Sequence, residues 1–104
     1  MRVIVHDERN EFNRQTHAYA EYRAFSGLVG KDADVADVTV DLTQPPRDED
    51  KEDNRTVVCT IAVRMTSGEI ERARAMARHA CAAIDRAVSL IRHRQSVAVP
   101  HSPR

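Results

Sequence analysis

The chain has 104 residues, with 16 acidic and 16 basic residues and a formal net charge of zero. This length fits one domain with one hydrophobic core and leaves no room for a second. The zero net charge excludes a strong overall field toward nucleic acid or membrane, and no apolar run approaches the length of a membrane span. The apolar run from Val3 to Val5 is too short for a signal peptide, so a cytoplasmic location is expected.

The charges are unevenly distributed along the chain. Between Asp32 and Asp53, nine acidic residues stand against only Arg47 and Lys51, whereas from Glu69 onward seven arginines stand against three acids. This predicts a mobile acidic loop over 44–54 and allows a basic face in the C-terminal half. The simpler alternative is an ordinary solvated surface.

The first third of the chain predicts a strand followed by a helix. The β-type run at 3–5 ends at a charged turn, and Asn13 is a suitable cap for a helix that Gly30 would stop. The helix shows one apolar stripe at steps of four and three, which predicts its buried face: Ala18, Tyr22, Phe25 and Val29.

Two strands follow, each with clear alternation. In the segment 35–42 the inward residues are Val38, Val40 and Leu42, and the prolines at 45 and 46 end the strand. In the segment 57–65 the odd-numbered residues Val57, Cys59, Ile61, Val63 and Met65 point inward, and the even-numbered ones Val58, Thr60, Ala62 and Arg64 point outward.

The last third is ambiguous at its start. The segment 69–75 alternates like a strand, but its alanines and arginines are also good helix formers. A helix from about His79 to Arg94 is predicted, with Ala80, Ile84, Ala87, Val88 and Ile91 inward, and residues 95–104 form a flexible tail. The element order is therefore β-α-β-β-(β)-α, a sheet with two helices on one face.

No residue pattern indicates catalysis or a metal site. The five histidines have no metal-ligand spacing, and no nucleophile and base can be paired, because Cys59 reads as strand core. We therefore expect no catalytic residues, no metal, no cofactor and no small-molecule substrate.

Several segments resemble the ribosome hibernation-promoting factor and ribosome-associated inhibitor family, also called the sigma-54 modulation family. The run Ala82-Ala83-Ile84-Asp85-Arg86-Ala87-Val88 is similar to the family's last helix, and the first forty residues align without gaps to its opening strand and helix. The turn Gly68-Glu69-Ile70 and the alternation after it look like the family's third hairpin and last strand. The resemblance therefore implies a strand at 69–75, and a double-stranded-RNA-binding-domain-like β-α-β-β-β-α fold with a mixed sheet and two helices on one face, over residues 1–94.

The resemblance also implies a function. Members of this family bind ribosomal RNA in the small subunit and inhibit translation during stress, so we expect a non-enzymatic ribosome-hibernation factor, monomeric, with the small ribosomal subunit as partner and no membrane contact. Arg23 stands where the family has a recurrent lysine, whereas Leu90 and His93 stand where it has a lysine and an arginine. The expected RNA-binding residues are Arg23, Arg72, Arg74, Arg78, Arg86, Arg92 and His93.

A second hypothesis keeps the fold but changes the role. The acidic loop at 44–54 would contact a basic partner, and the chain would act as a protein–protein adaptor or regulator.

Overall fold

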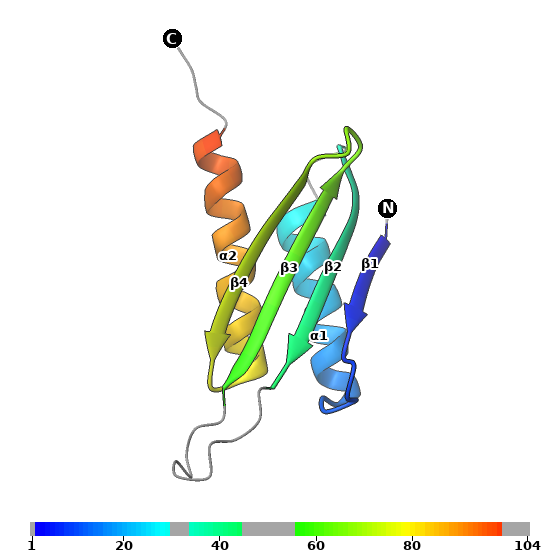
Figure 1. Ribbon diagram of the computed structural model, residues 1–104, viewed down its shortest axis with the longest axis vertical. Helices are drawn as coiled ribbons and strands as arrows, with labels where there is room; N and C mark the ends of the chain where they lie inside the picture. Colours follow the sequence, from blue (N-terminus) through cyan, green and yellow to red (C-terminus); the bar gives the residue numbers. More distant parts are fainter. Residues whose placement is uncertain (1, 30–33, 45–55, 99–104) are drawn as a thin grey trace.

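The computed structural model describes residues 2–29, 34–44 and 56–98. In chain order its elements are β1 (Arg2–His6), α1 (Arg14–Ala24), the π-helical turn η1 (Phe25–Val29), β2 (Val35–Thr43), β3 (Val57–Met65), β4 (Ile70–Ala77) and α2 (Ala80–Ala98). The strands form one sheet in the order β1-β2-β3-β4 (Figure 1), in which β1 is parallel to β2 and the other neighbours are antiparallel. The predicted α+β order β-α-β-β-β-α is confirmed, including the strand after the Gly68 turn.

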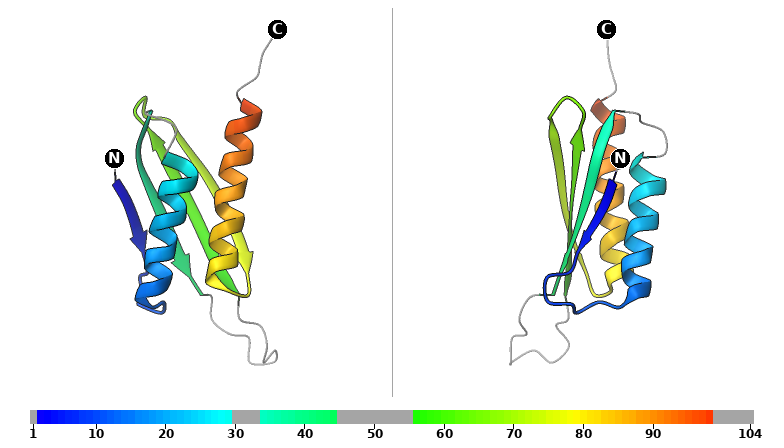
Figure 2. Two further views of the ribbon diagram at one scale, coloured as in Figure 1. Left: turned by 180° about the vertical axis from the view of Figure 1, so that it is seen from behind. Right: turned by 90° about the vertical axis from the view of Figure 1, so that its right-hand side faces the viewer.

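Both helices cover the same face of the sheet (Figure 2). α1 packs on β1 and β2, and α2 packs on β3 and β4. The other face of the sheet carries no helix within the described part of the chain (Figure 1). One face is therefore available for polar side chains, as one-sided sheets allow.

The central strands bury the residues that their alternation predicts. Val38, Val40, Cys59, Ile61 and Val63 are fully buried on the helix-covered face. Their register neighbours on β4 are small, since Ala73 lies opposite Ile61 and Ala75 lies opposite Cys59. Val58 points to the open face as its alternation predicts, yet it is only 4% exposed, because Thr43 and Met76 flank it in the neighbouring strands.

α1 begins at the predicted cap but buries a different face. The Oδ1 atom of Asn13 accepts a hydrogen bond from the backbone N–H of Thr16 at 2.8 Å. Tyr22 and Phe25 are 66% and 55% exposed, however, and Ala18 is exposed as well. The buried residues lie on a different stripe at steps of four: Ala20, Ala24 and Leu28.

The physical reason for this difference is the close approach of the two helices. A Cβ atom added at Gly27 would lie 2.8 Å from Cγ1 of Val88, so η1 and α2 approach closely at this position. In the resulting orientation α1 turns Ala20 and Ala24 to the core and leaves Tyr22 and Phe25 exposed. The side chain of Val29 and the predicted stop at Gly30 lie outside the described residues.

α2 packs as its sequence predicts and runs further than expected. Ile84, Ala87, Val88 and Ile91 are fully buried, while Ala80 is half-buried. The helix continues to Ala98, four residues beyond its expected end at Arg94, because no glycine or proline interrupts it before Pro100. Residues 99–104 and most of the predicted acidic loop (45–54) lie outside the described residues.

Candidate nucleic-acid interface

Two of the predicted RNA-binding arginines lie on the open face of β4. Ala73 and Ala75 are buried under α2, so strand alternation turns Arg72 and Arg74 to the opposite side, where both are exposed. Neither guanidinium makes a hydrogen bond or ion pair with another described residue. Arg78, in the turn between β4 and α2, is exposed in the same way. These three charges are available to an external ligand.

Arg86 lies beside them, along the outer edge of β4. Its Nη1 atom donates a hydrogen bond to the backbone carbonyl of Met76 at 2.7 Å. Two turns further along α2, Arg94 donates in the same way to the carbonyl of Arg72. β4 is an edge strand, so these carbonyls have no partner in the sheet. Arg86 therefore lies at the edge of the strand that carries Arg72 and Arg74, although one of its donors is already occupied.

Arg23 is engaged inside the molecule. Its Nε donates to Oδ1 of Asp85 at 2.8 Å, and the hydroxyl of Tyr19 donates to the same oxygen at 2.7 Å. Partial burial acts to raise the pKa of Asp85, but the hydrogen bonds from Tyr19 and Arg23 outweigh it and hold the pKa below its ordinary value. Arg23 is only 24% exposed. Arg23 was expected to be free to contact RNA, whereas in the structure it joins α1 to α2.

Arg92 and His93 are exposed on α2 but lie on different sides of it. The Cδ atom of Arg92 would be 3.9 Å from a Cβ atom added at Gly27, so Arg92 faces η1. His93 lines a hollow that faces β4. Six residues along a helix correspond to a rotation of about 240°, whereas seven return almost to the starting side. Arg86 and His93 therefore lie on one side of α2, and Arg92 lies on another.

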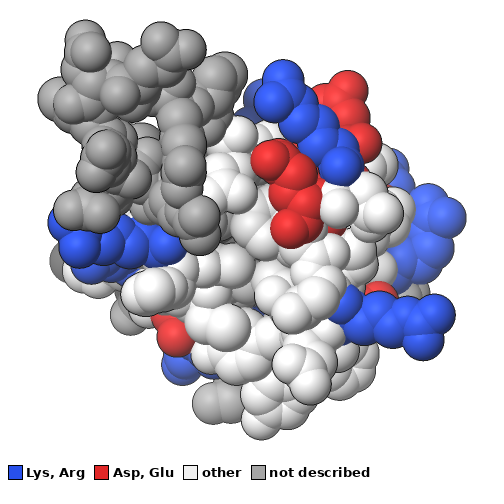
Figure 3. Space-filling view, turned by 90° about the horizontal axis from the view of Figure 1, so that it is seen from below, with Lys and Arg blue, Asp and Glu red and all other residues white. Residues whose placement is uncertain are grey.

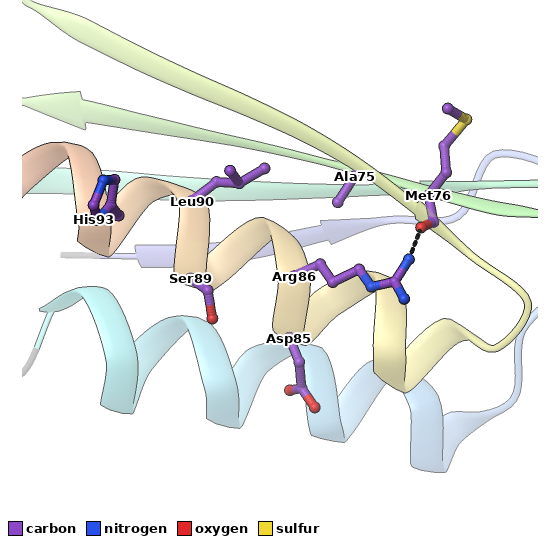
Figure 4. A pocket seen from close by; sticks show the side chains of 7 residues that line it. All are labelled: Ala75, Met76, Asp85, Arg86, Ser89, Leu90 and His93. Atoms are coloured by element: carbon purple, nitrogen blue, oxygen red, sulfur yellow. Dashed lines mark hydrogen bonds between the residues drawn. The ribbon is translucent and has the colours of Figure 1, made fainter.

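The hollow lies between β4 and α2 and has a volume of about 570 Å³ (Figure 4). Arg86 and His93 stand along it, and Leu90 points toward β4 between them. The exposed fractions of Met76 and Leu90 are 54% and 40%. The lining is mainly apolar, and its residues are Ala75, Met76, Asp85, Arg86, Ser89, Leu90 and His93.

Among the described residues that Figure 3 shows, the basic side chains do not form one continuous patch. On the end of the molecule that Figure 3 shows, Lys and Arg side chains stand at the margins of a wide uncharged area. On the open face of the sheet, Arg64 is paired with Asp37, and its Nε–Oδ2 distance is 3.0 Å. This hydrogen bond lowers the pKa of Asp37. The predicted RNA-binding residues therefore fall into two groups. Five lie around β4 and its edge: Arg72, Arg74, Arg78, Arg86 and His93. The other two, Arg23 and Arg92, lie on the sides of the helices that face each other.

The structure also shows an apolar surface that the sequence interpretation assigned to the core. Tyr22 and Phe25 line a second hollow of about 460 Å³ together with Val3, Ala18 and Glu21, between α1 and β1. The helical spacing of Tyr22 and Phe25 gave no signal of their exposure, because the buried stripe of small residues has helical spacing too.

The described residues contain no group of three or more His, Cys, Asp or Glu side chains placed to hold a metal ion. Cys59 is fully buried, and burial raises the pKa of its thiol to about 12, so it stays protonated at neutral pH. Cys81 is exposed at the start of α2. Within the described ranges, neither helix combines the length and apolar character needed to cross a membrane.

Comparison with known proteins places this geometry among solved structures. No protein-family model and no curated protein matches the chain. A ribosomal subunit interface protein from Coxiella burnetii superimposes with a TM-score of 0.70 at 8% identity, covering 92% of this chain and 94% of that one. The N-terminal domain of Protein Y from Thermus thermophilus gives a TM-score of 0.64 at 19% identity, covering 89% and 90%. Both are members of the hibernation-promoting factor family. The family resemblance seen in the sequence is thus confirmed at the level of the fold: the chain has the fold of these ribosomal interface proteins.

Proposed function

We propose that the chain is a non-enzymatic ribosome-associated factor that binds RNA of the small ribosomal subunit and inhibits translation, promoting ribosome hibernation under stress. The observation that carries this proposal is the superposition on a ribosomal subunit interface protein over 92% of this chain and 94% of that one. The two chains match over nearly their whole lengths, so the structural similarity covers nearly all of the neighbour's solved chain and not only a fragment of it. A cytoplasmic monomer whose binding domain spans 1–94 is part of the same proposal.

The exposed arginines of β4 support the RNA part of the proposal. Arg72, Arg74 and Arg78 are exposed and have no ion-pair partner among the described residues. Arginine guanidinium groups suit phosphate oxygens, and RNA helices are recognised mainly through phosphate, ribose and shape. Asp37 and Asp85 are each paired with an arginine, so these two carboxylates repel an approaching phosphate less than free ones would.

A cell-free translation assay tests the proposal. The purified chain is expected to lower the yield of a reporter protein in a dose-dependent way. The Arg72→Gln/Arg74→Gln variant is expected to need at least about ten-fold more protein for the same inhibition, because two phosphate contacts are lost. Arg9→Gln/Arg14→Gln is the matched control, since it removes two exposed charges from the β1–α1 side.

Normal inhibition by the β4 variant would show that these arginines are not the contact. No inhibition by the wild-type chain, at concentrations above those of the ribosomes, would contradict the proposed function itself. Circular dichroism of every variant must match the wild-type spectrum for either conclusion to hold.

A further inference from the structure

The two edges of the sheet differ in how their backbone groups are used. At the β4 edge the carbonyls of Met76 and Arg72 accept hydrogen bonds from Arg86 and Arg94. At the opposite edge β1 pairs with β2 (Figure 1), and its backbone makes no other hydrogen bond with a residue of the ranges 2–29, 34–44 and 56–98. Alternate N–H and C=O groups of β1 therefore point away from the sheet without a partner in the described part of the chain. Such an edge is a template for the addition of another strand.

The hollow between α1 and β1 lies beside this edge. It has a volume of about 460 Å³, and its lining includes Val3 of β1 and the exposed aromatic residues Tyr22 and Phe25. α1 runs along β1 on the helix-covered face (Figure 2). A strand added about 4.8 Å from β1 would turn every second side chain to that face, as β1 turns Val3 and Val5. These side chains would cover apolar surface that the hollow now leaves exposed.

The pairing of β1 with β2 shows which side chains suit the open face of an added strand. Arg2 and His6 lie on the open face, and they stand opposite Asp37 and Asp41 of β2. The hydrogen bond from Arg64 lowers the pKa of Asp37, and the nearby charge of Arg2 lowers it further. Opposite charges that face each other across two strands are favourable. Acidic residues therefore suit the open-face positions of a strand next to β1.

These features favour a peptide of another protein over a second copy of this chain. β1 has the sequence Arg-Val-Ile-Val-His and contains no acidic residue. Two copies joined through their β1 edges would therefore leave Arg2 without a carboxylate in the facing strand. On the α1 side Glu21 lines the hollow and would repel an acidic residue, so apolar residues suit that side.

We propose that the outer edge of β1 binds an extended peptide segment of a partner protein, in which acidic and apolar residues alternate. The segment adds to the sheet as a further strand. Its apolar side chains pack beside Val3 and Phe25, and an acidic side chain lies near Arg2. The inference goes beyond the proposed function and is independent of it, since β1 and β4 lie at opposite edges of the sheet.

A peptide titration followed by two-dimensional amide NMR spectra of the full chain tests the inference. The probe is the synthetic peptide Asp-Val-Thr-Val-Asp-Leu-Thr, the sequence of residues 37–43, because β1 already pairs with this sequence in the fold. The control peptide has lysine in place of both aspartates. The aspartate peptide is expected to shift the amide signals of β1 and of the residues around Phe25, and to leave those of β4 unchanged.

The charge preference is tested by a swap. The lysine peptide is expected to bind the wild type at least about five-fold more weakly than the aspartate peptide, because like charges then face each other across the strands. Arg2→Glu should abolish this preference, since the charge on the β1 side is then reversed. Equal affinity of the wild type for both peptides would overturn the inference.

The apolar contact is tested by a matched pair of variants. Phe25→Ser is expected to weaken binding of the aspartate peptide by about five- to twenty-fold, because an apolar side chain beside the added strand is lost. Leu90→Ser removes an exposed apolar side chain beside β4 and should bind like the wild type. The amide spectra also show whether each variant keeps the wild-type fold.

Three further outcomes would overturn the inference. They are the absence of any shift with about 1 mM peptide, shifts at β4 instead of β1, and unchanged affinity in Phe25→Ser. If the β1 signals move with protein concentration in the absence of peptide, a second copy occupies the edge, which also contradicts the inference. The translation assay tests the proposed function separately, so either proposal can fail without the other.

Discussion

Two aspartates, Asp85 and Asp7, bind neighbouring polar groups of the chain, so those groups are not free to contact an external ligand. Asp85 takes up Arg23 and Tyr19, so that a residue expected to contact RNA instead holds the two helices together. Asp7 works similarly at the end of β1. It accepts hydrogen bonds from the backbone N–H groups of Glu11 and Phe12 at 2.9 Å each, and its Oδ2 lies 2.9 Å from Nε2 of His17. Its side chain is 3% exposed.

The hydrogen bonds of Asp7 predict a loss of stability in acid. Burial acts to raise its pKa, but the hydrogen bonds from His17, Phe12 and Glu11 together hold the pKa below its ordinary value. A depressed folded-state pKa means that the stabilisation is present above the unfolded value of about 3.9 and is lost as the pH falls through the lower folded value. Asp7→Asn should therefore be less stable than the wild type by about 1–3 kcal/mol at pH 7.

Urea unfolding at several pH values measures this difference. The gap between the wild type and Asp7→Asn is expected to shrink as the pH falls below about 4. Glu8→Gln, a neighbouring change at an exposed position, serves as the control. A gap that stays constant from pH 7 to pH 2.5 would show that the charge of Asp7 contributes nothing to folding.

Among the elements, η1 and α2 approach each other closely. Gly27 allows this approach, because a Cβ atom there would lie 2.8 Å from Cγ1 of Val88, a fully buried and branched side chain. The same closeness explains why Ala20 and Ala24 face the core while the aromatic residues of the helix face the solvent. Helix packing therefore fixes which apolar surface the chain exposes.

Gly27→Ala tests this contact. Alanine is a better helix former than glycine by up to about 1 kcal/mol, but the added methyl group overpacks the interface at a cost of about 1–3 kcal/mol. We expect a net loss of about 1 kcal/mol in the free energy of unfolding, measured by urea denaturation. Ser26→Ala, at the exposed neighbouring position, should leave stability unchanged or slightly raised. A Gly27→Ala variant as stable as Ser26→Ala would mean that the helices are not in close contact here.

The strands and α2 were predictable because their patterns are local. The alternation of Val38 and Val40 and the helical spacing of Ile84 and Ile91 each identify one buried face. The strand β4 could not be separated from a helix by pattern alone, since its buried residues are alanines; the family resemblance was needed. The prediction of the buried face of α1 was wrong, because two sets of residues have helical spacing. The close approach of η1 to α2, which the sequence does not show, determines which set is buried.

The candidate site was less predictable than the fold. Residue type identified the arginines, but not their partners or directions. The pairing of Arg23 with Asp85 joins residues 62 positions apart, and no local pattern contains it. The hollow at Leu90 likewise depends on how α2 lies against β4, which sequence spacing does not specify.

At the scale of the whole molecule, the chain presents two different sides. The β4–α2 side carries Arg72, Arg74 and Arg86 and the larger hollow, whereas the β1–α1 side carries Tyr22 and Phe25. With a net charge of zero, binding to RNA cannot rest on an overall field and must come from the local arrangement of arginines. The central claim is therefore that the β4–α2 side binds the small ribosomal subunit.

Co-sedimentation of the purified chain with small ribosomal subunits across a salt series tests this claim most directly. The account predicts saturable binding that weakens as salt rises and is lost in the Arg72→Glu/Arg74→Glu/Arg86→Glu variant. A matched variant with glutamate at the exposed positions Arg2, Arg9 and Arg14 should still bind. No binding of the folded wild-type chain at about 0.15 M salt, or equal loss in both variants, would contradict the account and favour the adaptor hypothesis.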